Sequence, residues 1–344
     1  MSKARIENAN GFFGGSALIN VNERRPYLND AGVACIVNAQ GKEQEIKANA
    51  TLRYDEWRDV DQTVIKAATD RLTGVKLLMA RGLVHNLGSL GITLSQWQSE
   101  SDMTSANVSM SGVTAGERDR VAYSTYNVPV PIIHKDWEIN LRALEASRRM
   151  GESLDVTTAA IAGRKVAEGL EDLLFSTTAV KVGGQSIYGF LNFSPAISVV
   201  AGTPWDDLAA DGNAVIIEAV SDMLSALRAN NYYGPFDIIV PGAYESKLDE
   251  DYRAFETRTV RQRIEALSGV NQVTVADRLS GDNVVFVQTT SDVVDLAIAQ
   301  DVSTIQWSTN GGMTEKFKTM ACMVPRLKQD YDGKCGIGVL TFSS

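Results

Sequence analysis

The residues that could act as nucleophiles, general bases or metal ligands are few and scattered. The sequence contains two histidines, His85 and His134, and three cysteines, Cys35, Cys322 and Cys335. A zinc site needs closely spaced cysteine and histidine ligands, yet Cys322 and Cys335 are thirteen residues apart with no histidine between them. We therefore interpret the cysteines as small buried thiols and both histidines as surface residues.

Two acidic clusters, Asp59-Val60-Asp61 and Asp249-Glu250-Asp251, carry the oxygen ligands that a divalent cation prefers. Both fall in predicted helices, where runs of charge normally face solvent. We interpret them as solvated helix faces, and a divalent-cation site remains the alternative.

The glycine-rich segments do not match a nucleotide-binding or hydrolase motif. Gly41-Lys42 is followed by Glu43 and lacks the upstream glycine of a phosphate-binding loop. The segment GKCGIG at 333–338 precedes a predicted strand and not a helix N-terminus. The segment GSLG at 88–91 lacks the G-x-S-x-G spacing of a hydrolase elbow. We therefore predict no catalytic residues, no cofactor and no metal, and expect that the protein is not an enzyme.

The composition is that of an ordinary globular protein. Of 344 residues, 44% are hydrophobic and 22% are charged, and the length allows two or three lobes. The net charge of -9 argues against sequence-specific recognition of nucleic acid, which needs a clustered basic face. The sequence has neither an apolar run long enough to span a membrane nor the apolar core of a secretory signal. The odd number of cysteines suits a reducing cytoplasm.

The first fifty residues are predicted to form an arm and not a domain. Glycines at 11, 14 and 15 flank Phe12 and Phe13, and the segment 22–30 is rich in charge and turn-forming residues. Residues 31–52 contain a short apolar run and are interpreted as a hairpin or strand pair. An arm without its own core packs on another surface, either on its own chain or on a neighbour.

A long polar hairpin is predicted over residues 91–130. Alternating segments at 91–97, 107–110 and 121–131 surround a polar tip at 111–120. An isolated two-stranded hairpin is marginal in water, so this projection needs a surface to lie on.

Helices and strands of mixed order indicate an α+β fold. Helical periodicity predicts helices at 55–82, 136–150, 155–175, 213–230 and 243–252. Strands are predicted at 237–240, 284–287, 293–297 and 302–307, with a last strand pair at 317–325 and 336–342.

The order of these parts, with several local matches, resembles the major capsid proteins of tailed bacteriophages, which have the Hong Kong 97-type fold, and the related encapsulins. The matching segments are 51–61 as the opening helix, 128–139 as the strand leaving the extended loop, 159–175 as the spine helix, YGFLN at 188–192 as the turn after it, and 232–240, 295–301 and 325–333. Together they extend over most of residues 51–344.

The resemblance implies a division into an N-terminal arm, an extended β-hairpin loop, a peripheral domain with a long spine helix, and an axial mixed α/β domain. The corresponding ranges are 1–50 for the arm, 51–90 for the first peripheral helix, 91–130 for the extended loop, 131–189 for the peripheral domain with the spine helix, 190–300 for the axial domain and 301–344 for the final peripheral strands.

The resemblance also implies a major capsid protein that self-assembles into pentamers and hexamers of an icosahedral shell around double-stranded DNA. The implied partners are other copies of the chain, scaffolding, portal and decoration proteins, and packaged DNA without sequence-specific contacts, in a virion assembled in the bacterial cytoplasm and without a membrane. An encapsulin shell around an enzyme cargo is the alternative. The fifty residues before the opening helix favour the phage capsid, because encapsulins usually begin close to that helix. The expected inter-subunit contacts are Trp97, Met103, Arg118 and Arg120 in the loop and Arg24, Arg25 and Tyr27 in the arm.

Overall fold

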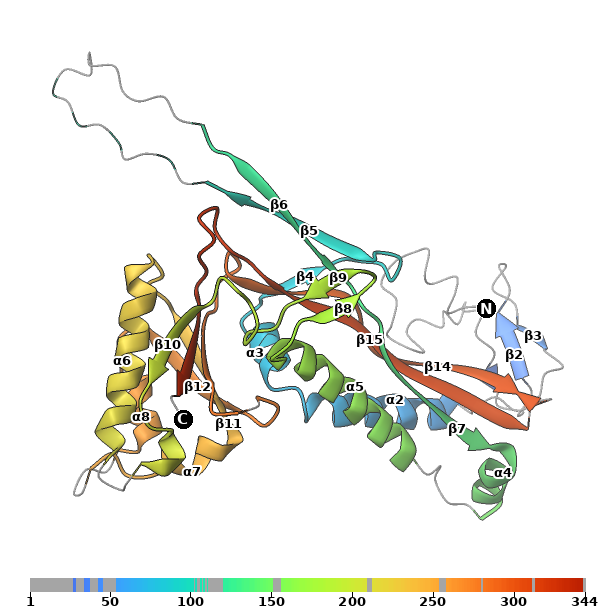
Figure 1. Ribbon diagram of the computed structural model, residues 1–344. Coiled ribbons are helices and arrows are strands. Elements are labelled where there is room, and N and C mark those ends of the chain that lie inside the picture. Colours follow the sequence, from blue (N-terminus) through green and yellow to red (C-terminus); the bar gives the residue numbers. More distant parts are fainter. Residues whose placement is uncertain are drawn as a thin grey trace. The chain divides into compact units, whose positions relative to one another are not determined.

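The computed structural model divides the chain into two units, which are described separately (Figure 1). Unit 1 contains residues 1–71, 132–168 and 300–321, and unit 2 contains residues 72–131, 169–299 and 322–344. The residues that the structure describes are 27–28, 34–37, 43–45, 54–101, 103, 106, 108, 110, 120–150, 156–208, 212–253, 258–279, 281–310 and 313–342.

Unit 1 packs helices against one face of an antiparallel sheet. Its elements are α2 (Tyr54–Thr69), β7 (Ile133–Asn140), α4 (Leu141–Met150), the first part of α5 (Thr157–Phe175), the end of β14 (Val294–Thr309) and the start of β15 (Thr314–Leu327). The β7 strand pairs with β15 in an antiparallel register. Trp137 on β7 stacks on Phe317 on β15 with ring centroids 4.1 Å apart, and its indole N–H donates to Thr319 Oγ1 at 3.1 Å. This aromatic pair is the centre of the unit's core.

A glycine allows α2 and α5 to cross closely in unit 1. A Cβ at Gly163 would lie 2.7 Å from the backbone oxygen of Val64 on α2. Ala159 and Ala162 beside it are small and buried in the same core. This contact explains the small residues on one side of α5, because a larger side chain would push the helices apart.

A small three-stranded antiparallel sheet precedes α2. It has the order β1 (Tyr27–Leu28), β2 (Ala34–Val37), β3 (Glu43–Glu45). Cys35 lies opposite Tyr27 on one side and Glu45 on the other. The strand pair predicted within residues 31–52 is therefore confirmed as β2 and β3.

Unit 2 is built around a five-stranded mixed sheet with the order β10-β16-β13-β11-β12. These strands are β10 (Ile197–Ala201), β16 (Ile337–Phe342), β13 (Val284–Gln288), β11 (Phe236–Pro241) and β12 (Val270–Ala276). The central strands β11 and β13 are buried along their whole lengths. Their side chains share a large core with buried residues of α6 (Asn213–Ala229), α8 (Val260–Glu265) and the short helices η1 (Trp205–Asp207), η3 (Gly242–Tyr244) and α7 (Glu245–Leu248).

Unit 2 also contains α3 (Gly74–Ala80), β4 (Val84–Asn86) and two hairpins. One hairpin consists of β5 (Leu94–Glu100) and β6 (Tyr123–Pro129), and the other of β8 (Val180–Val182) and β9 (Gln185–Ile187). The β4 strand pairs in parallel with the start of β14. Strands β14 and β15 thus contribute to both units, in a sheet with the order β4-β14-β15-β7.

The helix predicted at 55–82 is wrong as one element, because it consists of α2 and α3 with a break between them. Three backbone amides at the start of α3, those of Thr73, Gly74 and Val75, donate to the carboxylate of Glu171 at 2.9–3.0 Å. Glu171 is buried, and burial raises its pKa while these three hydrogen bonds lower it. A distant side chain therefore caps a helix start that lies inside the apolar stripe.

Two further predictions are corrected. The helix predicted at 136–150 begins at Leu141, since residues 133–140 form β7, where Trp137 and Ile139 contact the core. The strands predicted at 317–325 and 336–342 exist as β15 and β16 but do not pair, because β15 lies between β14 and β7 while β16 lies between β10 and β13.

The α+β class and the two longest helices among the described residues are confirmed. Helix α5 runs from Thr157 to Phe175 and α6 from Asn213 to Ala229, close to the predicted bounds. The turn after α5 explains its glycine and asparagine: the Gly189 N–H donates to Asn192 Oδ1 at 3.0 Å, and Asn192 Nδ2 donates to the Ser176 carbonyl at 2.9 Å. The strands predicted at 293–297 and 302–307 are one continuous strand, β14. Strands β10 and β12 and helix α8 were not predicted.

Candidate assembly surface

The β5–β6 hairpin has two open edges. Its ladder includes the bonds from the Val130 N–H to the Thr93 carbonyl and from the Ser101 N–H to the Ala122 carbonyl, both 2.9 Å long. Hydrogen-bonded pairs alternate along an antiparallel ladder. The outward-facing backbone positions are therefore 94, 96, 98 and 100 on β5 and 123, 125 and 127 on β6. Within the described part of the chain no backbone group pairs with them. Open edges of this kind are templates for another strand.

A buried ion cluster holds the root of the hairpin. Arg326 donates from Nε and Nη2 to the two carboxylate oxygens of Asp295, each at 2.5 Å, and Lys328 Nζ lies 2.7 Å from Asp295 Oδ2. Arg326 also donates from Nη1 to Ser95 Oγ on β5 at 3.2 Å, and its guanidinium lies 5.8 Å from the ring of Trp97. Arg326 and Asp295 are both buried, so water does not screen their attraction.

An aromatic pocket of about 460 Å³ lies beside this root in unit 2. Its apolar walls are Trp97, Tyr126, Tyr188, Phe193, Pro195 and Pro325. The rings form two pairs: Trp97 stacks on Tyr126 at 6.2 Å between centroids, and Tyr188 tilts against Phe193 at 6.3 Å. A pocket of this size and composition is typical of sites that take an apolar group.

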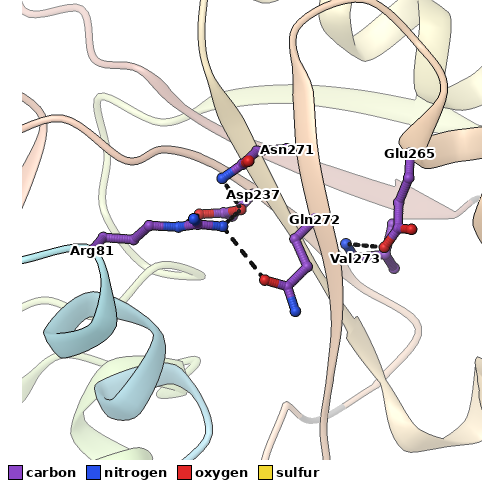
Figure 2. Close-up of polar contacts among 6 residues, drawn as sticks. All are labelled: Arg81, Asp237, Glu265, Asn271, Gln272 and Val273. Atoms are coloured by element: carbon purple, nitrogen blue, oxygen red, sulfur yellow. Dashed lines mark hydrogen bonds and ion pairs between the residues drawn. The ribbon is translucent and has the colours of Figure 1, made fainter.

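A second buried carboxylate organises the central sheet of unit 2 (Figure 2). Asp237 on β11 is fully buried, and Arg81, just after α3, binds both of its oxygens through Nε and Nη2 at 2.9 and 2.8 Å. Asn271 Nδ2 on β12 donates to the same carboxylate at 3.0 Å. Figure 2 also shows Glu265, which accepts the N–H of Val273 on the edge strand β12 at 3.1 Å. These contacts fix α3 and the edge strand to the sheet.

We expect Arg81→Ala to lower the free energy of unfolding of unit 2 by about 3 kcal/mol, because it leaves the buried Asp237 carboxylate without its cation. The value is at the low end for buried pairs because the Arg81 side chain is 30% exposed. Arg261→Ala is the matched control: Arg261 is 28% exposed, but its partner Asp249 is 62% exposed. The control should cost less than about 1 kcal/mol. Equal losses in urea unfolding would contradict the assignment.

Several titratable groups of the described residues are buried or lie in ion pairs. Among the described residues no group of three His, Cys, Asp or Glu side chains could hold a metal ion. Cys322 and Cys335 are buried as predicted, and burial raises the pKa of Cys335 to about 12, so its thiol stays protonated. Burial, and then the charge of Arg326, lowers the pKa of His85. His134 is exposed and lies 3.3 Å from Asp136.

The structure places only some of the contact residues predicted from sequence. Trp97 packs within its own chain at the hairpin root, Met103 is 53% exposed and Arg120 is exposed. Tyr27 lies in β1. Arg24, Arg25 and Arg118 lie outside the described residues. Their roles as inter-subunit contacts stay predictions. The clusters around Asp295 and Asp237 were not found from the sequence.

The described helices include none that is both long and apolar enough to cross a membrane.

Comparison with known proteins relates this arrangement to protein shells. Residues 46–339 match a family described as Family of unknown function (DUF6260). The chain is 26% identical over 284 residues to the type 1 encapsulin shell protein EncA of Myxococcus xanthus (strain DK1622). The aligned region covers 82% of this chain and 92% of EncA.

Solved structures of shells are similar as well. The virus-like particle from Pyrococcus furiosus aligns with a TM-score of 0.60 and 16% identity, over 83% of this chain and 98% of that one. The capsid of Myoviridae phage XM1 aligns with a TM-score of 0.60 and 12% identity, over 79% of this chain and 93% of that one. The proteins that the chain resembles are structural shell proteins and not enzymes, which supports the prediction that it is not an enzyme. The chain thus belongs to the DUF6260 family and has the α+β Hong Kong 97-type fold of phage capsids and encapsulins.

Proposed function

We propose that this chain is the major capsid protein of a tailed bacteriophage, which self-assembles into pentamers and hexamers of an icosahedral shell around double-stranded DNA. The observation that carries the proposal is a hairpin with two open edges on a chain with the capsid fold. A free hairpin of this kind is marginal in water, whereas contact with a neighbouring subunit would cover its backbone groups.

Assembly follows from the geometry of such contacts. Each subunit extends its hairpin onto one neighbour and receives the hairpin of another. This contact is heterologous, and heterologous contacts close into rings. Many weak contacts per subunit then act together in a closed lattice. In this arrangement the axial part at 190–300 surrounds the ring axes, the spine helix α5 braces each subunit, and the arm at 1–50 lies across neighbours.

Two observations bear on the contents of the shell. Fifty-three residues precede α2, which favours a phage capsid with an N-terminal arm. The alignment with EncA covers 92% of that shell protein and favours the alternative of an encapsulin around an enzyme cargo. As a capsid, the protein would act with scaffolding, portal and decoration proteins and assemble in the bacterial cytoplasm. Its net charge of -9 fits a wall that encloses DNA without sequence-specific contacts.

Negative-stain electron microscopy of the 344-residue chain expressed alone tests self-assembly. We expect closed shells or ring-shaped capsomers. A monodisperse monomer at high concentration would overturn the proposal.

The contents of the shell are tested by analysing particles purified from the natural source and by reading the genes next to the gene for this chain. Nuclease-protected double-stranded DNA, with portal and terminase genes alongside, is the result expected of a phage capsid. A ferritin-like or peroxidase passenger would instead establish the encapsulin.

A further inference from the structure

One buried polar atom of a residue at the aromatic pocket lacks a partner. The indole nitrogen of Trp97, which lines the pocket, has no hydrogen-bond partner within the described part of the chain. A buried donor left unpaired is costly, and native proteins satisfy nearly all such groups. The backbone carbonyl of an extended peptide is an acceptor of the kind that this indole N–H lacks.

The open edge of β6 runs into the same pocket. Asn127 lines the pocket, and its backbone N–H and carbonyl face outward from the ladder. Pro129 ends this edge because it has no N–H. The pocket therefore combines an aromatic floor with a short stretch of unpaired strand, which is the geometry that receives an extended peptide with an apolar anchor.

We propose that this pocket binds the N-terminal segment Asn10–Gly15 of a copy of this chain, with Phe12 and Phe13 as the aromatic anchors. The rings would pack against the Trp97–Tyr126 and Tyr188–Phe193 pairs. The backbone of the segment would pair with the Asn127 edge and offer an acceptor to the Trp97 indole N–H.

The sequence outside the described residues favours this occupant. Aromatic rings gain most from a pocket lined by aromatic rings and prolines. Residues 1–26 hold two phenylalanines side by side, and the hairpin tip at 102–119 holds no aromatic residue. The other phenylalanine outside the described residues, Phe255, is followed by the charged Glu256 in a gap of only four residues. Gly11 and Gly14 on either side of the pair let a backbone approach a surface closely.

The available chain is long enough to reach a distant surface. Phe13 precedes Tyr27, the first described residue, by fourteen positions, and a fully extended chain of that length spans about 46 Å. A linker of this length does not restrict the segment to the surface next to β1. The proposal goes beyond shell formation, because docking can occur in a capsomer or a monomer.

Disulfide trapping tests the contact directly. The variant Phe13→Cys/Ser194→Cys, made with Cys35→Ser, places thiols on the segment and at the exposed rim of the pocket. The matched control is Phe13→Cys/Ser198→Cys, because Ser198 is also exposed in unit 2 but does not line the pocket. After mild oxidation we expect mass spectrometry to find residues 13 and 194 linked at least tenfold more than residues 13 and 198. Equal yields, or no link to residue 194, would overturn the proposal.

Hydrogen exchange gives an independent readout in the full chain. Phe12→Ser/Phe13→Ser should speed exchange of the Thr125 and Asn127 amides at least tenfold, because their outward N–H groups lose a partner. Leu18→Ser/Ile19→Ser changes the same arm outside the segment and should leave these rates unchanged. Unchanged rates in the phenylalanine variant would contradict docking. Electron microscopy of the same samples reports shell formation separately, so either proposal can fail while the other stands.

Discussion

Deletion of residues 101–119, with Asn-Gly joining Glu100 to Arg120, is expected to leave the monomer folded and to abolish closed shells. The deletion removes the hairpin beyond the end of β5, where the described side chains Met103, Val108 and Met110 are all exposed. The buried clusters around Phe286 and around Val324 include none of the described residues of this segment. The ladder between β5 and β6 is retained up to the pair Glu100–Tyr123, and Asn-Gly with residues 120–122 closes it as a five-residue loop, which is a common hairpin length. The folding of either unit therefore has little to lose, whereas contacts to a neighbour lose their reach.

The measurement is electron microscopy of the deletion variant beside circular dichroism and thermal unfolding. A second variant replaces residues 101–119 with a Gly-Ser segment of equal length, which keeps the reach and removes the side chains. If the specific tip makes the contact, both variants will fail to form shells while their unfolding midpoints stay within a few degrees of the parent. Closed shells from the deletion variant would show that the hairpin tip at 101–119 does not link subunits.

Local sequence patterns were sufficient to predict two long helices and the β5–β6 hairpin. The apolar period of α5 and α6 and the polar alternation of the β5–β6 hairpin are properties of neighbouring residues, and they predicted those elements. The period failed for β7, where Ile133, Trp137 and Ile139 fit a strand as well as a helix. Pairing with β15, more than 170 residues away, decides that segment. Tertiary context of this kind overrides local propensity.

The contacts of the buried carboxylates could not be predicted from the sequence, for a different reason. Glu171, Asp237 and Asp295 each stand in an apolar run, at GLEDLLF, FDIIV and VVDLAIA. A carboxylate in such a run signals a buried charge that must have a partner. The sequence does not name the partner: Arg81 precedes Asp237 by 156 residues, and the amides that bind Glu171 precede it by 96 to 98. The position of a buried acid is thus predictable in principle, while its contacts require the fold.

Arg326→Leu is expected to destabilise unit 2 strongly, because it breaks the ion cluster at the hairpin root. The side chains of Arg326 and Asp295 are only 4% and 8% exposed, so the Asp295 carboxylate would keep Lys328 alone as its cation. Removing one partner of a buried pair costs about 3–5 kcal/mol. For a unit of this size such a loss corresponds to a fall of roughly 10 °C in the unfolding midpoint. Amides of β5 should also exchange faster, because Ser95 loses its hydrogen bond and Trp97 its cation.

Arg278→Leu provides the matched control for this substitution. Arg278 also binds a carboxylate through two nitrogens: its Nε and Nη2 donate to the oxygens of Asp172 at 2.9 and 2.6 Å. The side chains of Arg278 and Asp172 are, however, 43% and 53% exposed. An exposed pair contributes about 1 kcal/mol or less, so burial is the main variable that differs. Adding Asp295→Asn to Arg326→Leu should recover part of the loss, because the amide removes the unpaired buried charge. If Arg326→Leu and Arg278→Leu lower the midpoint equally, or if Asp295→Asn brings no recovery, then the cluster does not stabilise the hairpin root through its buried charges. In that case the packing of Arg326 against Trp97 would be the contact that holds the root.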